Sequence, residues 1–316
     1  MLSREQRAVN LRDLPLVRRL SQNGSVLNSE IGLTRSVGGL NISAVLLPPR
    51  GLYTLLARVD QQALIGQLRL RPEDPNAQLV FIAPRLESDR DDTAWLHLLD
   101  ALAQEAGRRG AHTLMAEVDE SSALFETMRL AGFAIYARQE IWRCEPGTLR
   151  PPRDALELQA ANDSHLPGIH ALYAQTMPRM VQQIAEVNTQ GLVYRENDRI
   201  EGFIALAEGK QGVYLMPCIN PERYRLAAGL ITAAAARVQH AHKVPLYVRV
   251  RRYQEWLEGP LEKLGFSPWT QQAVMVRHIA AGIRQAGFAS LRQALDVLPA
   301  PAGRATETLI DFRNQE

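Results

Sequence analysis

The side chains that could carry chemistry are few and widely spaced. Cys144 and Cys218, the only cysteines, form no Cys-x-x-Cys or Cys/His spacing, which indicates reduced thiols rather than a disulfide or a zinc site. His240 and His242 stand two residues apart at the end of an expected helix, where their side chains diverge, so no metal site is predicted. No P-loop, dinucleotide-binding glycine pattern or Ser-His-Asp signature occurs.

Two groups of charged residues remain open to more than one interpretation. Glu117 and Asp119 alternate on an expected strand, where a carboxylate facing a cleft could take a proton from an amine and one facing outward would lie in solvent. Arg249, Arg251 and Arg252 form a basic cluster at the end of another strand. They could meet a phosphate or an acidic substrate, but we expect a solvated strand end.

The bulk composition is that of a globular protein large enough for two domains. The 316 residues are 46% hydrophobic and 22% charged, and the formal net charge is only +2. This balance favours neither a nucleic-acid nor a membrane partner. The first 20 residues are charged throughout, and the longest weakly polar run, 226–236, is too short for a membrane span. We expect a cytoplasmic protein, with a homodimer possible.

These candidates must be positioned by regular elements, and hydrophobic periodicity with turn signals predicts the same order of elements twice. Each half reads helix, hairpin, strand, helix, strand, helix, strand. In the first half the ranges are 13–22, 52–59 with 63–71, 78–84, 93–109, 112–120, 121–132 and 133–143. In the second half they are 163–177, 191–198 with 199–209, 212–220, 225–241, 245–252, 254–264 and 269–277. Asp13 is expected to cap the first helix, and 21–43 to be mostly loop.

The last helix and strand of each half have similar sequence patterns. MRLAGFAIYARQEIWR begins at residue 128 and LEKLGFSPWTQQAVMVR at residue 261, and both contain Gly-Phe after an amphipathic segment. A long-period repeat of this kind indicates an internal duplication with one fold per copy. The predicted organisation is an N-terminal domain, a Pro/Gly linker, a C-terminal domain and a helical extension with a tail, at 1–145, 146–155, 156–278 and 279–316.

This order, with Gly-Phe after the last helix, resembles the GNAT superfamily of acyl-CoA-dependent N-acetyltransferases. The resemblance covers roughly residues 8–143 and 156–277. It implies an α/β (α+β) fold made of two GNAT-like domains, each a mixed, mostly antiparallel sheet flanked by helices. In that family the sheet splays between its fourth and fifth strands. Acyl-CoA lies in the gap, and its pyrophosphate meets a glycine-containing loop at the start of the next helix.

The first copy departs from that pattern at the phosphate loop. Residues 84–92 contain no glycine, and four carboxylates crowd the place where a pyrophosphate would bind: Glu87, Asp89, Asp91 and Asp92. Carboxylates repel phosphates unless a cation intervenes, so Asp91 or Asp92 is expected to cap the following helix instead.

The second copy comes closer to the pattern. The resemblance implies that its fourth strand and the following turn bind acetyl-CoA as a cosubstrate, with no metal. The thioester arm would meet Met216, Cys218, Ile219 and Asn220. The pyrophosphate would meet Arg223, Tyr224, Arg225, Ala227, Ala228 and Gly229. The alternative is that the small residues only pack a helix on the sheet, with the arginines in solvent. Ala227 can replace a glycine only if its φ is negative.

The resemblance also suggests catalytic roles. The family commonly has a tyrosine four residues before the Gly of Gly-Phe, where it protonates the leaving thiolate, but those positions are Met128 and Leu261. Tyr253 is the candidate replacement, with Tyr224 as a second, and Glu117 is the candidate base. Cys218 has no activating base nearby in the sequence and is expected to be a buried structural thiol.

Two hypotheses follow. The leading one is an N-acetyltransferase that moves acetyl directly from acetyl-CoA to a small-molecule or peptide amine, with the cofactor on the C-terminal copy. The alternative is a non-catalytic scaffold that binds a ligand or another protein, favoured by the missing phosphate glycines and tyrosines.

Overall fold

The computed structural model describes residues 4–35, 51–72, 74–150, 156–186 and 189–279. These ranges belong to one compact unit that spans residues 1–280. The helices expected within 279–297 and the tail that follows fall outside the described residues, except for Ile279.

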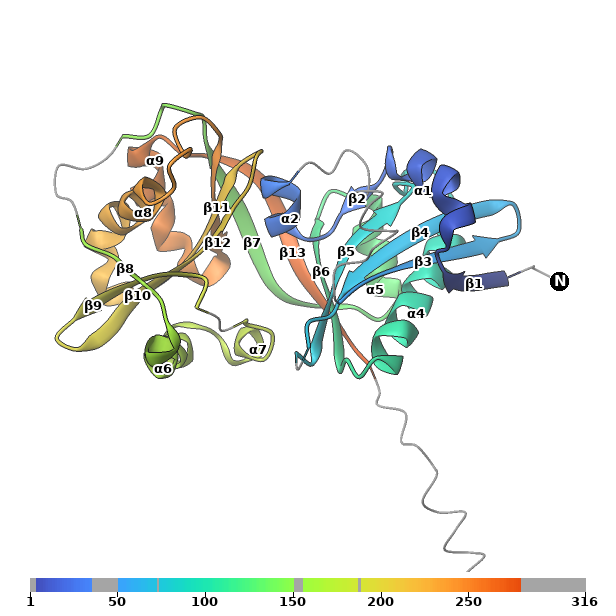
Figure 1. Cartoon of the computed structure of the whole chain (residues 1–316), viewed down its shortest axis with the longest axis horizontal. Coiled ribbons are helices and arrows are strands. Elements are labelled where there is room, and N and C mark those ends of the chain that lie inside the picture. Colours follow the sequence, from blue (N-terminus) through green and yellow to red (C-terminus); the bar gives the residue numbers. More distant parts are fainter. Residues whose placement is uncertain (1–3, 36–50, 73, 151–155, 187–188, 280–316) are drawn as a thin grey trace, which may run out of the picture. The chain divides into compact units, whose positions relative to one another are not determined.

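The first copy contains the predicted elements with small shifts at their ends, and Figure 1 labels them. Its strands are β1 (Arg4–Ala8), β2 (Ser25–Val26), β3 (Leu52–Val59), β4 (Gln62–Arg69), β5 (Asn76–Ala83), β6 (Thr113–Asp119) and β7 (Ala134–Cys144). Its helices are α1 (Leu14–Ser21), α2 (Ser29–Thr34), α4 (Thr93–Arg108) and α5 (Ala123–Leu130). The short elements β1, β2 and α2 were not individually predicted.

The second copy repeats this order. Its strands are β8 (Gln159–Ala160), β9 (Gly191–Glu196), β10 (Arg199–Glu208), β11 (Val213–Ile219), β12 (Leu246–Arg251) and β13 (Ser267–His278). Its helices are α6 (Leu166–Thr176), α7 (Arg179–Gln182), α8 (Ala227–Ala236) and α9 (Glu258–Leu264), with 3-10 turns at Pro221–Leu226 and Arg252–Leu257. Helix α8 is therefore shorter than the predicted 225–241.

Two local predictions about helix ends have different outcomes. Gly132 and Gly265 have φ angles of 83° and 95°, so each Gly-Phe pair turns the chain out of its helix through a left-handed residue. Asp13 does not cap α1 as predicted. Its carboxylate is buried and accepts hydrogen bonds from Arg7 at 2.6 and 2.7 Å. The helical segment instead begins with a 3-10 turn capped by Asn10.

The two copies share one hydrogen-bonded sheet instead of forming two separate ones. Its strand order is β1-β3-β4-β5-β6-β13-β7-β12-β11-β10-β9-β8. The last strand of the first copy, β7, pairs with β12 of the second, and the last strand of the second copy, β13, pairs with β6 of the first. The copies have thus exchanged their final strands, which also pair with each other and run side by side in Figure 1.

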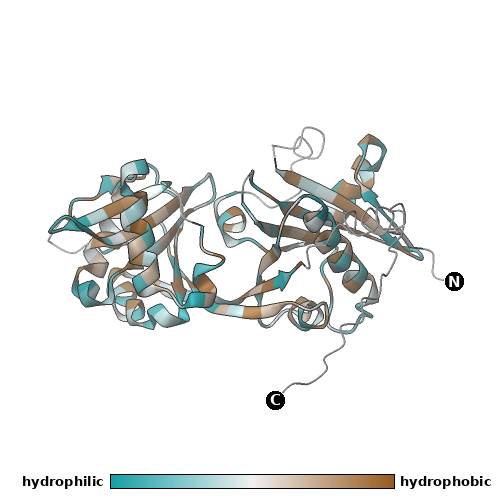
Figure 2. Ribbon diagram, turned by 90° about the horizontal axis from the view of Figure 1, so that it is seen from below, coloured by the Kyte–Doolittle hydropathy of each residue, from teal (hydrophilic) through white to brown (hydrophobic). Residues whose placement is uncertain are grey.

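Each copy has its own hydrophobic core, and the strands carry much of the hydrophobic colour in Figure 2. In the first copy α4 and α5 pack on β3–β6, around a buried Trp95. In the second, α8 and α9 cover one face of β10–β12, and α6 and α7 contribute to a separate cluster with Phe203 and Cys218. Together these layers position two places where neighbouring parallel strands separate.

Candidate active site

The splay of the first copy is filled by its own chain. Strands β5 and β6 pair only from Asn76–Gln78 to Thr113–Met115 and then diverge. Residues 25–28 enter the opening. Ser25 and Val26 pair with β5, the Leu27 amide donates to the Val80 carbonyl, and the Glu117 amide donates to the Leu27 carbonyl, both at 2.9 Å. The backbone groups that would hold an extended ligand are therefore already bonded to protein.

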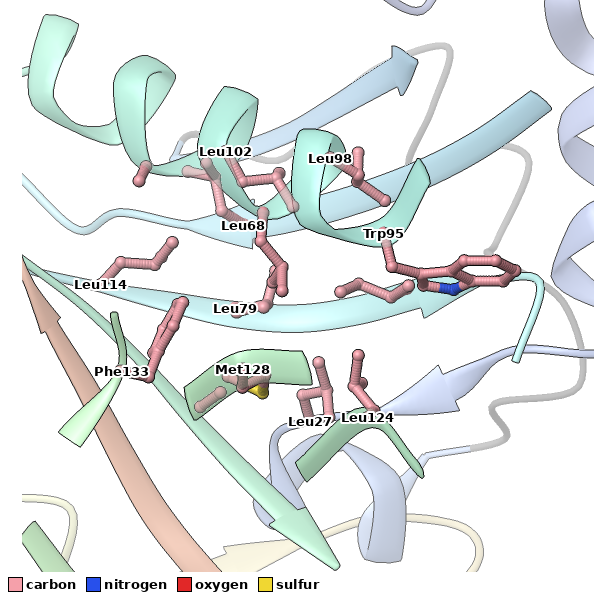
Figure 3. Close-up of a cluster of buried hydrophobic side chains, with 14 of the residues drawn as sticks. Leu27, Leu68, Leu79, Trp95, Leu98, Leu102, Leu114, Leu124, Met128 and Phe133 are labelled. Carbon is pink, nitrogen blue, oxygen red and sulfur yellow. The ribbon is translucent and has the colours of Figure 1, made fainter. Parts of the chain in front are cut away.

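This insertion, which we call the 25–28 plug, is packed as well as hydrogen-bonded. Leu27 is 2% exposed and lies beside Leu124 in the main core cluster (Figure 3). Gly24 precedes the plug, and a Cβ there would lie 2.0 Å from the Phe81 ring and 2.9 Å from the Ile82 carbonyl. The close approach of the plug to β5 therefore requires glycine.

The acidic loop after β5 is structural. Asp91 accepts hydrogen bonds from the Thr93 amide and hydroxyl at 3.0 and 2.6 Å, so it caps the start of α4. The sequence predicted this role for either Asp91 or Asp92. Asp92 instead accepts a hydrogen bond from Thr127 on α5 at 2.8 Å. With the plug in place and carboxylates at the helix start, the first copy does not fit an acyl-CoA.

The splay of the second copy contains no inserted strand, but one side chain bridges it. Strands β11 and β12 pair only from Val213–Leu215 to Leu246–Val248. The Val213 amide bonds across to Pro245, so in the alternation of a strand Pro217 also directs its backbone toward the opening. Pro217 has no N–H, and its carbonyl accepts a 2.8 Å hydrogen bond from the buried Gln254 amide, whose oxygen accepts from the Arg251 amide at 3.3 Å.

The predicted phosphate segment has mixed properties. Ala227 has φ −55°, so no left-handed residue is needed there, and Leu226, the N-cap residue of α8, makes no side-chain hydrogen bond to the helix. The preceding 3-10 turn runs directly into α8, however, and its Tyr224 carbonyl accepts the hydrogen bond of the Ala227 amide. Arg223, however, forms an ion pair with Glu196, and Arg225 donates a hydrogen bond to the Tyr224 hydroxyl at 3.1 Å.

The remaining predicted cofactor residues are held by protein contacts or packing. Asn220 caps the 3-10 turn and bonds Glu201 at 2.6 Å, Ile219 is buried, and Ala228 and Gly229 are half-buried on α8. The second copy therefore has a splay without an inserted strand, but the Pro217 carbonyl is bonded to Gln254 and the Ala227 amide to the Tyr224 carbonyl.

Beside the splay lies a pocket of about 100 Å³, lined by residues from both copies. The second copy contributes Met216 from β11, Arg249 and Arg251 from β12, and Tyr173 and Met177 from the α6 region. The first copy contributes Glu117 and Met115 from β6, and Asn28 and Glu30 from the plug and α2. The exchanged strands β13 and β7 lie between β6 of one copy and β12 of the other, and both of these strands reach the same pocket.

The two predicted catalytic residues both line this pocket. Tyr253 follows β12, and its burial raises the pKa of the phenol although Arg251 and Arg249 act in the opposite direction. A phenol of this kind stays protonated at neutral pH and can donate. Glu117 is half-buried, and one of its oxygens accepts a 2.7 Å hydrogen bond from the Ser29 amide. Its other oxygen has no hydrogen-bond partner among the described residues.

Arg249 and Arg251 are not at a solvated strand end, contrary to the expectation from sequence. Arg251 is 7% exposed, and both side chains line the pocket. The Nε of Arg249 and the Nε and Nη1 of Arg251 are buried without a hydrogen-bond partner, as is the hydroxyl of Tyr214 beside them. Only Arg252 fits the expectation, because it is exposed and lies 3.5 Å from Glu255.

Other predicted residues are not brought to the pocket. Cys218 is buried against the Thr176 hydroxyl at 3.1 Å, as expected, and burial raises the pKa of its thiol to about 11. Tyr224 is 50% exposed on the 3-10 turn. Asp119 bonds the Ser121 amide and hydroxyl in a turn, and Met128 and Leu261 are fully buried core residues.

Sequence reasoning missed Gln254, Pro217 and the 25–28 plug. A proline within an apolar strand pattern was a readable sign that one backbone donor is absent from β11. The plug and the Gln254 bridge gave no such sign, because both depend on contacts between segments more than 35 residues apart.

Solved structures with similar folds were found at low sequence identity. The tandem GNAT protein from the clavulanic acid biosynthesis pathway gives a TM-score of 0.53 at 14% identity, over 89% of this chain and 99% of that one. A GCN5-related N-acetyltransferase from Sphaerobacter thermophilus gives 0.52 at 10% identity, over 87% and 96%. A GCN5-related glucosamine N-acetyltransferase region of a fungal multi-domain β-N-acetylglucosaminidase gives 0.53 at 13% identity, over 87% of this chain and 38% of that one.

These similarities, with the two splayed strand pairs, define the class of fold as GNAT. The chain carries that fold twice, so it is a tandem GNAT-fold protein. No family model and no curated protein sequence matches it. Among the described helices none is long and apolar enough to cross a membrane. Within the same residues no group of three or more His, Cys, Asp or Glu side chains is placed to hold a metal ion.

Proposed function

We propose that the protein is an acyl-CoA-dependent N-acetyltransferase whose reaction takes place in the pocket between β6 and β12. The observation that carries the proposal is that Tyr253 and Glu117, from different copies, line one pocket at the open end of the β11/β12 splay. The second copy would hold acetyl-CoA, along β11 and at the start of α8. The free, buried thiols accord with a cytoplasmic location.

The chemistry would be a direct transfer. Acetyl-CoA supplies an activated thioester, and the acceptor is an amine. Glu117 would accept the proton that the amine loses as the new N–C bond forms, and Tyr253 would donate its phenolic proton to the thiolate released as the C–S bond breaks. Cys218 takes no part, because its raised pKa of about 11 keeps it a thiol.

A second function, a non-catalytic ligand-binding scaffold, is favoured by specific contacts. The 25–28 plug closes the first splay, and Gln254 occupies the Pro217 carbonyl in the second. If Gln254 never leaves that carbonyl, β11 offers no place for a thioester arm, and the pocket would bind its ligand without reaction.

Calorimetry with acetyl-CoA separates these functions. The transferase proposal expects binding by the unchanged protein and at least a tenfold loss with Gly229→Glu, because a carboxylate beside the first amides of α8 repels phosphate. Gly259→Glu is the matched control. It adds the same charge to α9 where a Cβ would meet nothing within 4 Å, and it should leave binding unchanged. No heat with the unchanged protein would leave the scaffold as the function.

Turnover is tested by thiol release with a panel of amines. Tyr253→Phe and Glu117→Gln should each lower kcat by about 10²-fold or more, the range for loss of a general acid or base. Tyr53→Phe is the control, because that tyrosine lies in the first copy under the Arg109 guanidinium and does not line the pocket. Equal rates for all three variants would contradict the assigned roles.

A further inference from the structure

The pocket holds two arginines that the protein itself does not neutralise. Arg249 and Arg251 alternate on β12, so both side chains project from the same face of the strand. Neither guanidinium has a hydrogen bond or an ion pair to the described residues, and three of their nitrogens are buried. A charge that is withdrawn from water without a partner is costly. Arg251 is buried and Arg249 is half-buried, so a site that keeps both side by side is built for something the chain does not supply.

The two cations also oppose each other. Burial, with the charge of Arg249 as the next cause, lowers the pKa of Arg251 to about 10. Even so, the guanidinium stays protonated at neutral pH, and so does that of Arg249. A ligand anion between them would remove both the repulsion and the desolvation cost, and a carboxylate matches the planar fork of a guanidinium.

Carboxylates line the pocket too, but they have their own partners. Glu186 bonds Gln78 at 2.7 Å and pairs with Arg71, and Glu30 lies 3.9 Å from Arg69. Glu117 accepts from the Ser29 amide and is near enough to both pocket arginines to raise their pKa, yet it forms no ion pair with either among the described residues. The pocket is therefore polar along its length, with Glu117 on the β6 side and the arginines on the β12 side.

We propose that this pocket binds a small amine that also carries a carboxylate, an amino-acid-like molecule. Arg249 and Arg251 hold the carboxylate, with the Tyr214 hydroxyl as a further donor, and Glu117 faces the amine. The pocket volume of about 100 Å³ is smaller than the roughly 150 Å³ cavity that holds benzene, so it suits only a small amino acid. The binding site stands on these contacts alone, and its use as the acceptor site rests on the proposed acetyl transfer.

Binding is tested without acetyl-CoA. The probes are glycine, β-alanine, L-aspartate and L-glutamate, each with its deaminated acid and its decarboxylated amine, by calorimetry and by the shift in Tm of the full chain. At least one amino acid should bind, and its deaminated acid should bind more weakly. A decarboxylated amine that retains no carboxylate should give no signal.

The variants Arg249→Met and Arg251→Met keep an unbranched, largely apolar stem and remove the charged guanidinium. Each should weaken carboxylate binding at least tenfold, whereas Arg252→Met, the exposed neighbour, should change it less than twofold. The ligand-free Tm gives a second readout. Removal of an unpaired buried charge should raise Tm by about 2–4 °C, whereas removal of an arginine with a structural role would lower it.

The anion site is overturned if no carboxylate binds the unchanged protein, or if binding survives both substitutions. A lowered Tm with Arg251→Met would do the same, by showing that the charge serves the fold. Failure of the transferase looks different, since the carboxylate would bind while no thiol is released with any amine. If instead amines that lack a carboxylate are acetylated as fast as amino acids, the proposed acetyl transfer is supported and the amino-acid-like acceptor is contradicted.

Discussion

At the scale of single residues, Gln254 decides whether the second splay is open. Its side-chain amide donates to the Pro217 carbonyl, and its oxygen accepts from the Arg251 amide, so it substitutes for the missing pairing between β11 and β12. Tyr253, the proposed acid, directly precedes it in the same 3-10 turn. A movement that releases Gln254 would therefore also move the phenol.

Replacement of this residue gives a direct test. With Gln254→Ala the Pro217 carbonyl is free to accept a hydrogen bond from a bound ligand, so acetyl-CoA should bind more tightly. One hydrogen bond is worth about 0.5–1.5 kcal/mol, which is roughly two- to tenfold in Kd. The measurement is a calorimetric titration beside Gln271→Ala, an exposed glutamine that bonds Glu140 on the neighbouring strand. Weaker binding by Gln254→Ala would show that the glutamine supports the site instead of blocking it.

At the scale of elements, one short segment serves both copies. The 25–28 plug closes the first splay, and α2, which follows it directly, contacts β11 of the second copy. Its last turn lies against the β10–β11 hairpin, where the Gln211 amide donates to the Thr34 carbonyl at 3.3 Å. Asn28 and Glu30 of this segment line the pocket. The same segment of the first copy thus fills the opening between β5 and β6 and lines the pocket beside β12.

Gly24→Val tests whether the plug depends on close packing. The added side chain would meet the Phe81 ring and the Ile82 carbonyl, so the plug should lift away from β5 at a cost of about 1–3 kcal/mol. Hydrogen exchange should become faster at the Leu27 and Glu117 amides, which bond across the plug. Gly259→Val, on an open helix surface, controls for the added valine. Unchanged protection at those two amides would mean that the plug is held by other contacts.

The elements themselves were largely predictable, and their caps less so. The repeated order and the left-handed Gly132 and Gly265 follow from local pattern, which is why both hairpins and both Gly-Phe ends were found. Asp13 was assigned to the cap of α1 because its type and position suit one, but its carboxylate pairs with Arg7 and accepts from the Asn10 amide in the capping box of the preceding 3-10 turn. Arg249 and Arg251 alternate with valines as on any half-exposed strand, and nothing local shows that the other copy covers that face.

At the scale of the whole molecule, the exchange of β7 and β13 joins the copies. The sequences of β7 and β13 could not reveal the exchange, because each of these duplicated strands could pair equally well with β6 or with β12. The exchange is also what carries Glu117 and Tyr253 to one pocket, since β6, β13, β7 and β12 lie in that order across the sheet. The candidate residues could therefore be predicted individually from the sequence, but the pocket that they share could not.

Cleavage of the chain between the copies tests this arrangement. We would place a protease site within residues 151–155 and cut the purified protein there. Because β7 bonds to β12 and β13 bonds to β6, the two pieces should stay together on size-exclusion chromatography and unfold in one transition. They should separate only in denaturant, since parting them would expose the edges of four strands and the hydrophobic residues that β7 and β13 bury. Pieces that elute apart after cleavage, each folded, would show that each copy completes its own sheet and that the shared pocket does not exist in solution.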